Sequence, residues 1–220
     1  MHRRQVITTA LAAIVATTAF AAPAQAAESD GDTGVITGLV TTPNGRPAAG
    51  ITVTVDDTEI ARPFTTTTAA DGRYSIEVPA GDAYVVSFVN GHLRQYSPRV
   101  TSYEQARVYT VVEGRKLRVN ERLLRTATLT GHLADENGAP VAGATVGIIN
   151  TETANEFQTT TAADGSFRFE KLAPGSVKVS FHALDGRRQW AHQKATYDEA
   201  DAYTLRLGRV TTVNDSLLAQ

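Results

Sequence analysis

Two short stretches of the sequence combine an aromatic residue with amide and cationic side chains. The first contains Arg94 and Tyr96, and the second contains Arg188, Gln189 and Trp190. Aromatic rings stack on the faces of sugars, and Arg and Gln side chains donate hydrogen bonds to hydroxyl groups. These five residues are therefore the predicted binding site, with a glycan or an anionic cell-surface polymer as the ligand.

The other residue types that carry chemistry form no catalytic pattern. The chain has no cysteine, no G-x-S-x-G sequence and no H-E-x-x-H sequence, which are the marks of common hydrolases and metalloproteases. His92, His132, His182 and His192 follow no metal-ligand spacing. We therefore predict that the protein is not an enzyme, and that it has no catalytic residue, no metal site and no cofactor.

Two aspartates occupy matching positions, each followed by glycine: Asp71 before Gly72 and Asp164 before Gly165. A carboxylate at the tip of a hairpin can bind calcium. Asp-Gly is also the preferred sequence of a two-residue hairpin turn, because the turn needs a positive φ. The turn accounts for both aspartates without a metal, so a two-residue hairpin turn is the prediction at each.

The elements that position these residues are encoded twice. Residues 66–78 read TTTAADGRYSIEV and residues 159–171 read TTTAADGSFRFEK. The later stretches 103–124 and 197–218 also match, with one more residue of separation, so one residue is inserted between Phe181 and Trp190. The matching residues lie 93 positions apart, since residue 66 corresponds to residue 159. Solenoid units are shorter, at about 20–50 residues. The pattern therefore indicates a duplicated domain.

Each copy has the period of β-structure. Tyr74, Ile76 and Val78 alternate with polar residues, as do Phe167 and Phe169. A period of two with one polar face is typical of antiparallel strands with one solvated side. We predict an all-β fold of two tandem seven-stranded antiparallel Greek-key β-sandwiches. The strands expected in the first copy are 34–41, 50–56, 63–68, 73–78, 83–89, 107–112 and 116–124.

One element departs from the β pattern. Residues 102–105 read SYEQ and residues 196–199 read TYDE. Both fit the capping box, in which Ser or Thr caps a helix and Glu or Gln follows three residues later. A single helical turn is therefore expected in the connection before the sixth strand of each copy.

Glycines and a proline recur at matched turn positions of the two copies. They are Gly38, Gly45, Pro47, Gly50 and Gly72 in the first copy and Gly131, Gly138, Pro140, Gly143 and Gly165 in the second. This spacing, which runs from the first strand to the aromatic strand of each copy, resembles the carboxypeptidase regulatory-like domain family. The resemblance implies the transthyretin-like (prealbumin-like) and starch-binding-like sandwich, and it implies little about function, because the fold has many uses.

Two groups of proteins that resemble this fold have special chemistry, and the sequence predicts neither. Cna B-type adhesin and pilin domains form a Lys–Asn isopeptide bond from a first-strand lysine. Asn120 and Asn214 lie in the last strands, but the first strands 35–41 and 128–134 contain no lysine. Transthyretin-like hydrolases of the urate pathway end in Tyr-Arg-Gly-Ser, whereas this sequence ends in Leu-Leu-Ala-Gln.

The N-terminal residues are predicted to direct secretion. Arg3 and Arg4 precede an apolar stretch that ends in the small-x-small pattern Ala24-Gln25-Ala26, which fits a cleaved signal peptide. The two arginines also loosely fit a twin-arginine signal. The predicted organisation is a signal peptide at 1–26, a flexible segment at 27–33, and sandwich domains at 34–125 and 126–220.

The net charge of the secreted chain indicates which classes of partner it is unsuited to bind. Loss of Arg3 and Arg4 reduces the 21 Lys and Arg residues to 19 against 23 Asp and Glu, a net charge of −4. Nucleic-acid partners require a basic surface, and anionic lipid attracts basic segments as well. We therefore predict no nucleic-acid partner, and no membrane association after signal cleavage.

The function predicted from the sequence is that of a secreted, extracellular, non-enzymatic binding or surface-interaction module, with carbohydrate as the candidate ligand. One alternative is a structural spacer, and another is an accessory subunit of a polysaccharide-degrading, starch-type system. At the level of the site, the alternative is that Tyr96 and Trp190 close the open end of each sandwich while the cations remain solvated.

Overall fold

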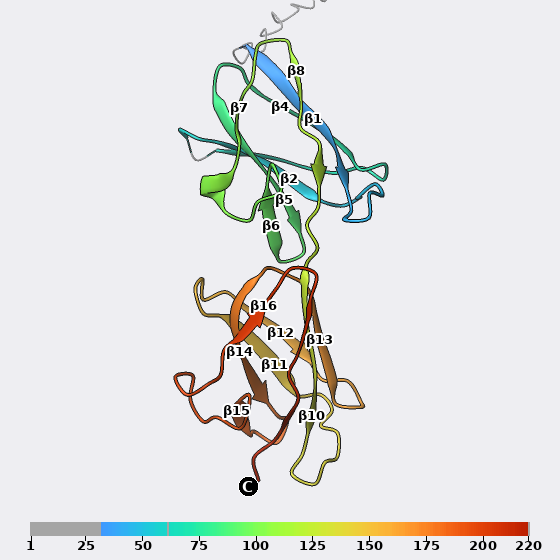
Figure 1. The fold of residues 1–220 in the computed structure, drawn as a ribbon, viewed down its shortest axis with the longest axis vertical. Coiled ribbons are helices and arrows are strands. Elements are labelled where there is room, and N and C mark those ends of the chain that lie inside the picture. The colour runs from blue at the N-terminus through green and yellow to red at the C-terminus, as the bar shows by residue number, and fades with distance from the viewer. Residues whose placement is uncertain (1–31, 61, 220) are drawn as a thin grey trace, which may run out of the picture.

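A computed structural model of the chain describes residues 32–60 and 62–219. The described chain forms two β-sandwiches that follow one another along the long axis of the molecule (Figure 1). The all-β tandem architecture expected from the sequence is thereby confirmed. The predicted signal peptide at 1–26 and residues 27–31 of the predicted flexible segment lie outside the described residues. Within the described residues, no helix has the length and apolar character needed to cross a membrane.

Domain 1 contains two facing sheets. One sheet has the order β4-β1-β8, with β9 also paired to β1, and the other has the order β3-β2-β5-β6, with β7 paired to β5. The strands are β1 (Thr33–Thr41), β2 (Thr52–Asp57), β3 (Pro63–Thr67), β4 (Arg73–Pro79), β5 (Ala83–Asn90), β6 (Leu93–Tyr96), β7 (Val108–Thr110), β8 (Lys116–Arg118) and β9 (Glu121–Arg122).

Domain 2 repeats this arrangement. Its sheets have the orders β13-β10-β17, with β18 paired to β10, and β12-β11-β14-β15, with β16 paired to β14. The strands are β10 (Ala127–Ala134), β11 (Thr145–Asn150), β12 (Glu156–Thr160), β13 (Ser166–Leu172), β14 (Gly175–His182), β15 (Arg188–Trp190), β16 (Tyr203–Leu205), β17 (Val210–Thr212) and β18 (Asp215–Ser216).

Each sandwich encloses its own hydrophobic core. On β4 the side chains of Tyr74, Ile76 and Val78 are buried, and on β13 those of Phe167 and Phe169 are buried, as the alternation predicts. Phe88 and Phe181, the matched residues of β5 and β14, are fully buried in the two cores. Because neither copy has a disulfide, burial of these apolar side chains stabilises each domain.

The last strand of each domain differs from the sequence prediction. Residues 116–124, expected as one antiparallel strand, form two short strands, β8 and β9, and both pair in parallel with β1. In domain 2, β17 and β18 pair in parallel with β10. The chain crosses from one sheet to the other before this strand, so it arrives beside the first strand in the same direction. Alternation of side chains reports burial and carries no information on strand direction.

The prediction of a two-residue hairpin at the Asp-Gly sequences was wrong. Gly72 and Gly165 do have positive φ, at 77° and 79°, but the strands on either side belong to different sheets. A Cβ on Gly72 would lie 2.5 Å from the Val40 carbonyl oxygen. Glycine therefore serves two needs here, the backbone conformation and a close approach to the first strand.

The predicted helical turns are only partly present. Tyr103–Gln105 form a single 3-10 turn, η1, but the Ser102 hydroxyl bonds to Glu104 and makes no capping bond to the backbone. In domain 2 the equivalent residues form a turn rather than a helix, and Thr196 Oγ1 accepts the Glu199 N–H at 3.4 Å. The capping-box prediction was wrong for domain 1, because the Ser102 side chain is bound to a neighbouring carboxylate.

The domains meet at a short boundary between β9 and β10. The turn of Gly91 and His92, between β5 and β6, contacts domain 2, where the His92 N–H donates to the Lys171 carbonyl at 2.9 Å. The His92 ring lies 4.0 Å from the Phe157 ring, measured between centroids. The space beside Gly91 is occupied by Lys171, because a Cβ at Gly91 would lie 2.4 Å from the Lys171 Cβ. Contacts of the Gly91–His92 turn, in addition to the linker, therefore connect the two domains.

Candidate functional site

The predicted binding residues lie on β6 and β15, two strands that the sequence analysis treated as irregular connections. Tyr96 pairs with Ser87 of β5, and Trp190 pairs with Ser180 of β14. The next residue of β5, Phe88, faces the core. Because side chains alternate along a strand, Ser87 and Tyr96 face outward. Tyr96 and Trp190 therefore lie on the outer face of the five-stranded sheet of each domain.

The glutamines on these strands face inward and join the two sheets. In domain 1 the Gln95 side chain is 1% exposed, and its Nε2 donates to Glu121 Oε1 at 3.0 Å. Its Oε1 accepts the Leu124 N–H at 2.7 Å. β6 and β9 belong to opposite sheets, so the Gln95 amide links the two halves of the sandwich.

Gln189 makes the same link in domain 2, which corrects the prediction that it binds a ligand. Its Nε2 donates to the Ser216 carbonyl at 2.9 Å and to Asp215 Oδ2 at 3.2 Å, and its Oε1 accepts the Leu218 N–H at 2.8 Å. The side chain is buried. A buried amide with both of its polar atoms satisfied is unavailable to a sugar hydroxyl, so Gln189 is a structural residue.

Each outward aromatic residue is paired with a second ring. Tyr96 and Tyr103 lie edge to face with centroids 5.7 Å apart, and Trp190 and Tyr197 lie edge to face at 5.3 Å. Tyr103 and Tyr197 are 44% and 39% exposed. The sequence analysis assigned both tyrosines only to the capping boxes. The signal that could have found them is the presence of Tyr at the same position in SYEQ and TYDE.

The alternative expected Tyr96 and Trp190 to close the open ends of the sandwiches. In the structure both rings lie on the outer sheet faces instead. They cover small polar residues of the neighbouring strand, since Ser87 is fully buried and Ser180 is 7% exposed. Tyr96 and Trp190 themselves remain partly exposed. Each domain therefore carries an outer sheet face with one partly exposed ring and one more exposed ring at its edge.

Cations lie beside these rings, in a different arrangement in each domain. Arg94 Nη1 donates to Ser87 Oγ at 2.9 Å, which holds the guanidinium against the face that carries Tyr96. Lys178 Nζ lies 4.1 Å from the Tyr197 ring centroid and donates to the Tyr197 carbonyl at 2.6 Å. This cation–π contact holds the Lys178 ammonium beside the aromatic pair. Lys178 was not among the predicted site residues.

Arg187 and Arg188, two neighbouring arginines near the start of β15, differ in their surroundings. Arg188 is exposed on β15. Arg187 forms ion pairs with Asp185 at 2.7 Å and with Glu136 at 2.9 Å. These two carboxylates offset the charge of Arg187, so Arg188 is the cation of this stretch that faces solvent.

One carboxyl group behind the site is buried. Glu121 is 5% exposed, and its pKa is raised by burial, although hydrogen bonds from Ser97, Arg122 N–H and Gln95 partly offset the shift. Tyr109 hydroxyl lies 2.7 Å from Ser97 Oγ and extends this network. All of these groups face the interior, so the network supports the fold of β6 and does not open to a ligand.

No catalytic arrangement is found among the described residues. His192 Nδ1 lies 2.7 Å from Asp201 Oδ2, and its Nε2 lies 3.4 Å from the Tyr203 hydroxyl, so this histidine has a carboxylate partner but no nucleophile. His132 and His182 are exposed. Groups of three or more potential metal ligands are absent from residues 32–60 and 62–219.

The two turn aspartates bind backbone and neighbouring side chains. Asp71 Oδ1 accepts the Arg73 N–H at 3.0 Å. Asp164 Oδ1 accepts both the N–H and the hydroxyl of Ser166, and these hydrogen bonds lower the pKa of Asp164. Each carboxylate stabilises its own turn, which is the role that the sequence analysis preferred over calcium binding.

Asn120, a possible partner in an isopeptide bond, also has a structural role. Its Oδ1 accepts the Leu39 N–H at 2.9 Å, between β8 and β9 where the regular pairing with β1 is interrupted. The first strands β1 and β10 contain no lysine.

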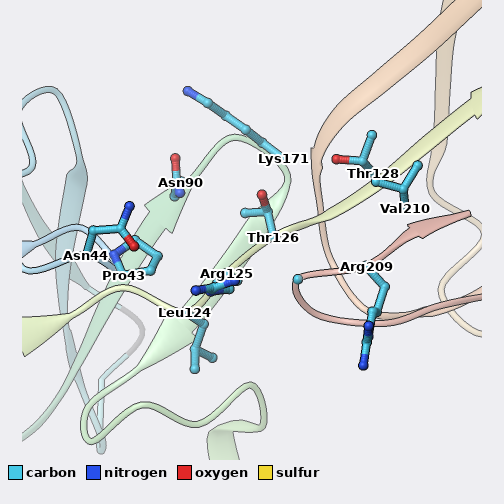
Figure 2. Close-up of a pocket in the computed structure, with 11 residues that line it drawn as sticks. Pro43, Asn44, Asn90, Leu124, Arg125, Thr126, Thr128, Lys171, Arg209 and Val210 are labelled. Carbon is cyan, nitrogen blue, oxygen red and sulfur yellow. The ribbon is translucent and has the colours of Figure 1, made fainter.

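A cleft of about 410 Å³ lies at the domain boundary (Figure 2). Arg125, Lys171 and Arg209 line it together with Asn90 and Thr126. Figure 2 shows the Lys171 and Arg209 side chains extending in different directions, so their charges do not converge on one point. The cleft therefore lacks the arrangement of donors that a compact anion site requires.

A comparison with family models decides the family. The model of the carboxypeptidase regulatory-like domain matches residues 35–123 and again residues 128–214. The chain belongs to the carboxypeptidase regulatory-like domain family. Two copies of this domain cover nearly all of the two sandwiches. Among curated proteins, no sequence matches the chain significantly.

Solved structures with a similar fold include several pilins. The streptococcal ancillary pilin is 13% identical, covers 87% of this chain and has a TM-score of 0.44. The chain spans 64% of the length of that pilin. GBS52, the minor pilin of Streptococcus agalactiae, is 13% identical with 84% of this chain and 95% of its own covered, at a TM-score of 0.44. The shaft pilin SpaA of Lactobacillus rhamnosus GG is 11% identical over 86% of this chain and 99% of its own, at 0.41.

Proposed function

We propose that the protein is a secreted, extracellular, non-enzymatic module that binds a glycan through the outer faces of its two five-stranded sheets. The observation that carries the proposal is the aromatic pair repeated at matched positions of both domains, Tyr96 with Tyr103 and Trp190 with Tyr197. A fold that needed these rings only for packing would bury them, whereas the second ring of each pair is exposed.

The chemistry of this face suits a sugar. A pyranose ring presents apolar C–H groups on one side and hydroxyl groups at its edge, so it needs an aromatic surface and nearby donors. Tyr197 supplies the exposed ring in domain 2 and Lys178 a donor beside it. Arg188, exposed on β15 two residues before Trp190, supplies a further donor on the same face. In domain 1, Tyr103 and Arg94 are the corresponding groups. Cationic donors favour acidic sugars over neutral ones.

The two domains also suit binding to an extended polymer. Each carries one aromatic face, and contacts at the boundary connect the domains. Two weak sites held at a fixed separation raise the apparent affinity for a repeating ligand, because the second site binds as an intramolecular step. The net negative charge of the chain argues against nucleic acid as the natural polymer, because its phosphates require a basic partner.

The experiment is a glycan array followed by fluorescence titration. The chain has a single tryptophan, Trp190, so its emission reports directly on the proposed site of domain 2. We expect a shift on addition of an acidic polysaccharide, and Tyr197→Ala should weaken binding about tenfold, equivalent to about 1.4 kcal/mol.

Val210→Ala is the control, because Val210 is an exposed apolar residue of β17, in the other sheet of domain 2. Equal effects of the two substitutions would contradict the proposal, as would an array without any binding. In the latter case the contacts at the domain boundary favour the spacer function instead.

A further inference from the structure

The contact between the two domains uses a surface at each end of the sandwich. Domain 1 contributes the turn of Gly91 and His92 between β5 and β6, and domain 2 contributes Phe157 and Lys171. Because the domains are copies of one sandwich, domain 2 has a turn at the position of the Gly91–His92 turn, and domain 1 has an end surface at the position of Phe157. Neither of these two surfaces takes part in the domain boundary.

The turn of domain 2 lies between β14 and β15. Its residues are Leu184, Asp185 and Gly186, one more than in domain 1, which places the inserted residue of the second copy here. Leu184 is 83% exposed, the highest exposure among the large hydrophobic residues of the described chain. Single exposed apolar side chains are common on protein surfaces. Leu184 is notable for its place, since it lies on the turn that corresponds to the Gly91–His92 turn, which contacts domain 2.

The backbone of this turn is held in place. The Ala183 N–H donates to the Arg187 carbonyl at 2.9 Å, and Arg187 is bound to Asp185 and Glu136. Leu184 is therefore presented by an ordered turn, and docking would cost little conformational entropy.

The end surface of domain 1 is hollow. Phe64, the second residue of β3, corresponds to Phe157, the second residue of β12. A cavity of about 560 Å³ lies beside it, and Val78, Pro79 and Ala80 form further apolar parts of its wall. The remaining lining residues are Asp32, Thr33, Arg62 and Glu77. In domain 2 the corresponding phenylalanine is covered by His92, whereas the Arg62 guanidinium lies over the Phe64 ring, 5.5 Å from its centroid.

We propose that this chain associates head to tail with a second copy of itself, with the Leu184 turn of one copy docked at the Phe64 cavity of the next. Figure 1 shows that β1 begins at the end of the molecule away from domain 2, whereas β15 lies near the C-terminal end. The two surfaces therefore face opposite ways along the long axis. A contact between two different surfaces leaves one of each unused at the ends, so the assembly is an open linear chain.

The association is weak for a physical reason. Within one chain the linker holds the domains at a high effective concentration, on the order of millimolar for short linkers. Two separate chains have no linker to raise their effective concentration, and the contact of one turn with one cavity is small. We expect assembly only when the protein concentration approaches about 1 mM, or when many copies are held on one surface.

The test is sedimentation of the secreted chain from about 10 µM to about 1 mM, with mass as the readout. The mean mass should rise with concentration. Leu184→Asp and Ala80→Glu should each abolish the rise, the first by removing the docking side chain and the second by placing a charge in the cavity wall. Val108→Asp is the control, because Val108 is 56% exposed on β7, outside both surfaces.

A mixture of the two variants distinguishes this arrangement from a symmetric dimer. The Leu184→Asp chain keeps its cavity and the Ala80→Glu chain keeps its turn, so together they should form a dimer that grows no further. A mean mass that stays at the monomer up to about 1 mM overturns the proposal. It is also overturned if the mixture remains monomeric, or if Val108→Asp abolishes association as fully as Leu184→Asp does.

Discussion

The two domains use the same buried glutamine but surround it with different polar groups. In domain 1, Gln95 bonds to the buried Glu121, and Ser97 and Tyr109 continue the network into the interior. In domain 2, Gln189 bonds to Asp215, which is more exposed and also accepts the His192 N–H at 2.8 Å. The amide link between the sheets is therefore what the fold retains, whereas the polar groups around it are free to vary.

A second difference between the domains concerns the aromatic residue at the matched position of β4 and β13. Tyr74 of β4 donates its hydroxyl to the Val119 carbonyl at 2.7 Å. The matched residue of domain 2 is Phe167, which has no hydroxyl. Both rings stack edge to face with the buried phenylalanine of the neighbouring sheet, at 5.9 and 5.7 Å. Aromatic packing is thus common to both domains, and the added hydrogen bond belongs to domain 1 alone.

The largest expected effect comes from a feature that the domains share. Gly38→Ala and Gly131→Ala place a Cβ 1.9 Å from the Val119 carbonyl oxygen and 1.8 Å from the Val213 carbonyl oxygen. Backbone must shift in both cases, so each substitution should lower the free energy of unfolding of its domain by about 3 kcal/mol. Far-UV circular dichroism reports both domains during denaturant unfolding, and Trp190 fluorescence reports domain 2 alone.

Gly81→Ala is the control for these two substitutions. Its φ is 93° and no atom lies within 4 Å of the added Cβ, so only backbone strain of about 1 kcal/mol applies. If Gly38→Ala were as mild as Gly81→Ala, the close approach between the first and last strands would be disproved.

The buried glutamines should show the next largest effect. Gln95→Ala leaves the Leu124 N–H and Glu121 without their partner, and loss of a buried hydrogen-bond partner costs about 1–3 kcal/mol. Gln189→Ala should cost less, because its partner Asp215 is less buried. Chemical denaturation of both variants, with Gln158→Ala as the exposed control, measures the difference. Equal costs would mean that burial of Glu121 adds nothing to the link.

The Tyr74 hydroxyl offers a reciprocal exchange between the domains. Tyr74→Phe should destabilise domain 1 by about 1 kcal/mol, the net worth of one buried hydrogen bond. Phe167→Tyr supplies the same hydroxyl to domain 2 and should raise its stability by up to about 1 kcal/mol. Thermal unfolding of the two variants tests whether this one atom accounts for the difference at this position. A stabilised Tyr74→Phe variant would show that it does not.

The smallest expected effect on stability comes from the Glu121 carboxyl group and depends on pH. Burial raises the pKa of Glu121 above its ordinary value of 4.5. The folded state then binds the proton more tightly than the unfolded state, so this group stabilises domain 1 fully below pH 4.5 and the contribution is lost as pH rises through the raised pKa. Glu121→Gln should remove that decline, whereas the exposed control Glu113→Gln should keep it. Stability curves against pH that coincide for wild type and Glu121→Gln would contradict this expectation.

Local pattern was enough to predict most strands of the sandwiches. The expected ranges 34–41, 73–78 and 83–89 agree closely with β1, β4 and β5, because these segments are rich in β-branched and aromatic residues and are bounded by turn residues. β6 was missed because one of its two inward residues is Gln95, whose polar side chain hides the alternation in so short a strand. β15 was missed for the same reason at Gln189. A buried amide is recognised only when its partners on the opposite sheet are known.

The candidate site was predicted in part. Arg94, Tyr96, Arg188 and Trp190 do lie on the outer sheet faces, but Gln189 belongs to the interior. Tyr103 and Tyr197 each follow the first ring of their pair by seven residues, and the connection after β6 or β15 folds back to place them against the outer sheet face. Lys178 lies on β14, the strand that pairs with β15. Residue spacing alone does not report how such a connection folds back.

The duplication, the β class and the family can be read from the sequence, because turn glycines and the period of two are local properties that each copy carries in full. The direction of the last strand and the inward position of Gln95 and Gln189 depend on contacts between strands far apart in the chain, so they become visible in the structure. The meeting of Trp190 with Tyr197 depends on how the connection after β15 folds back over the sheet. Such contacts are selected by the packing of the whole sandwich rather than by any one segment.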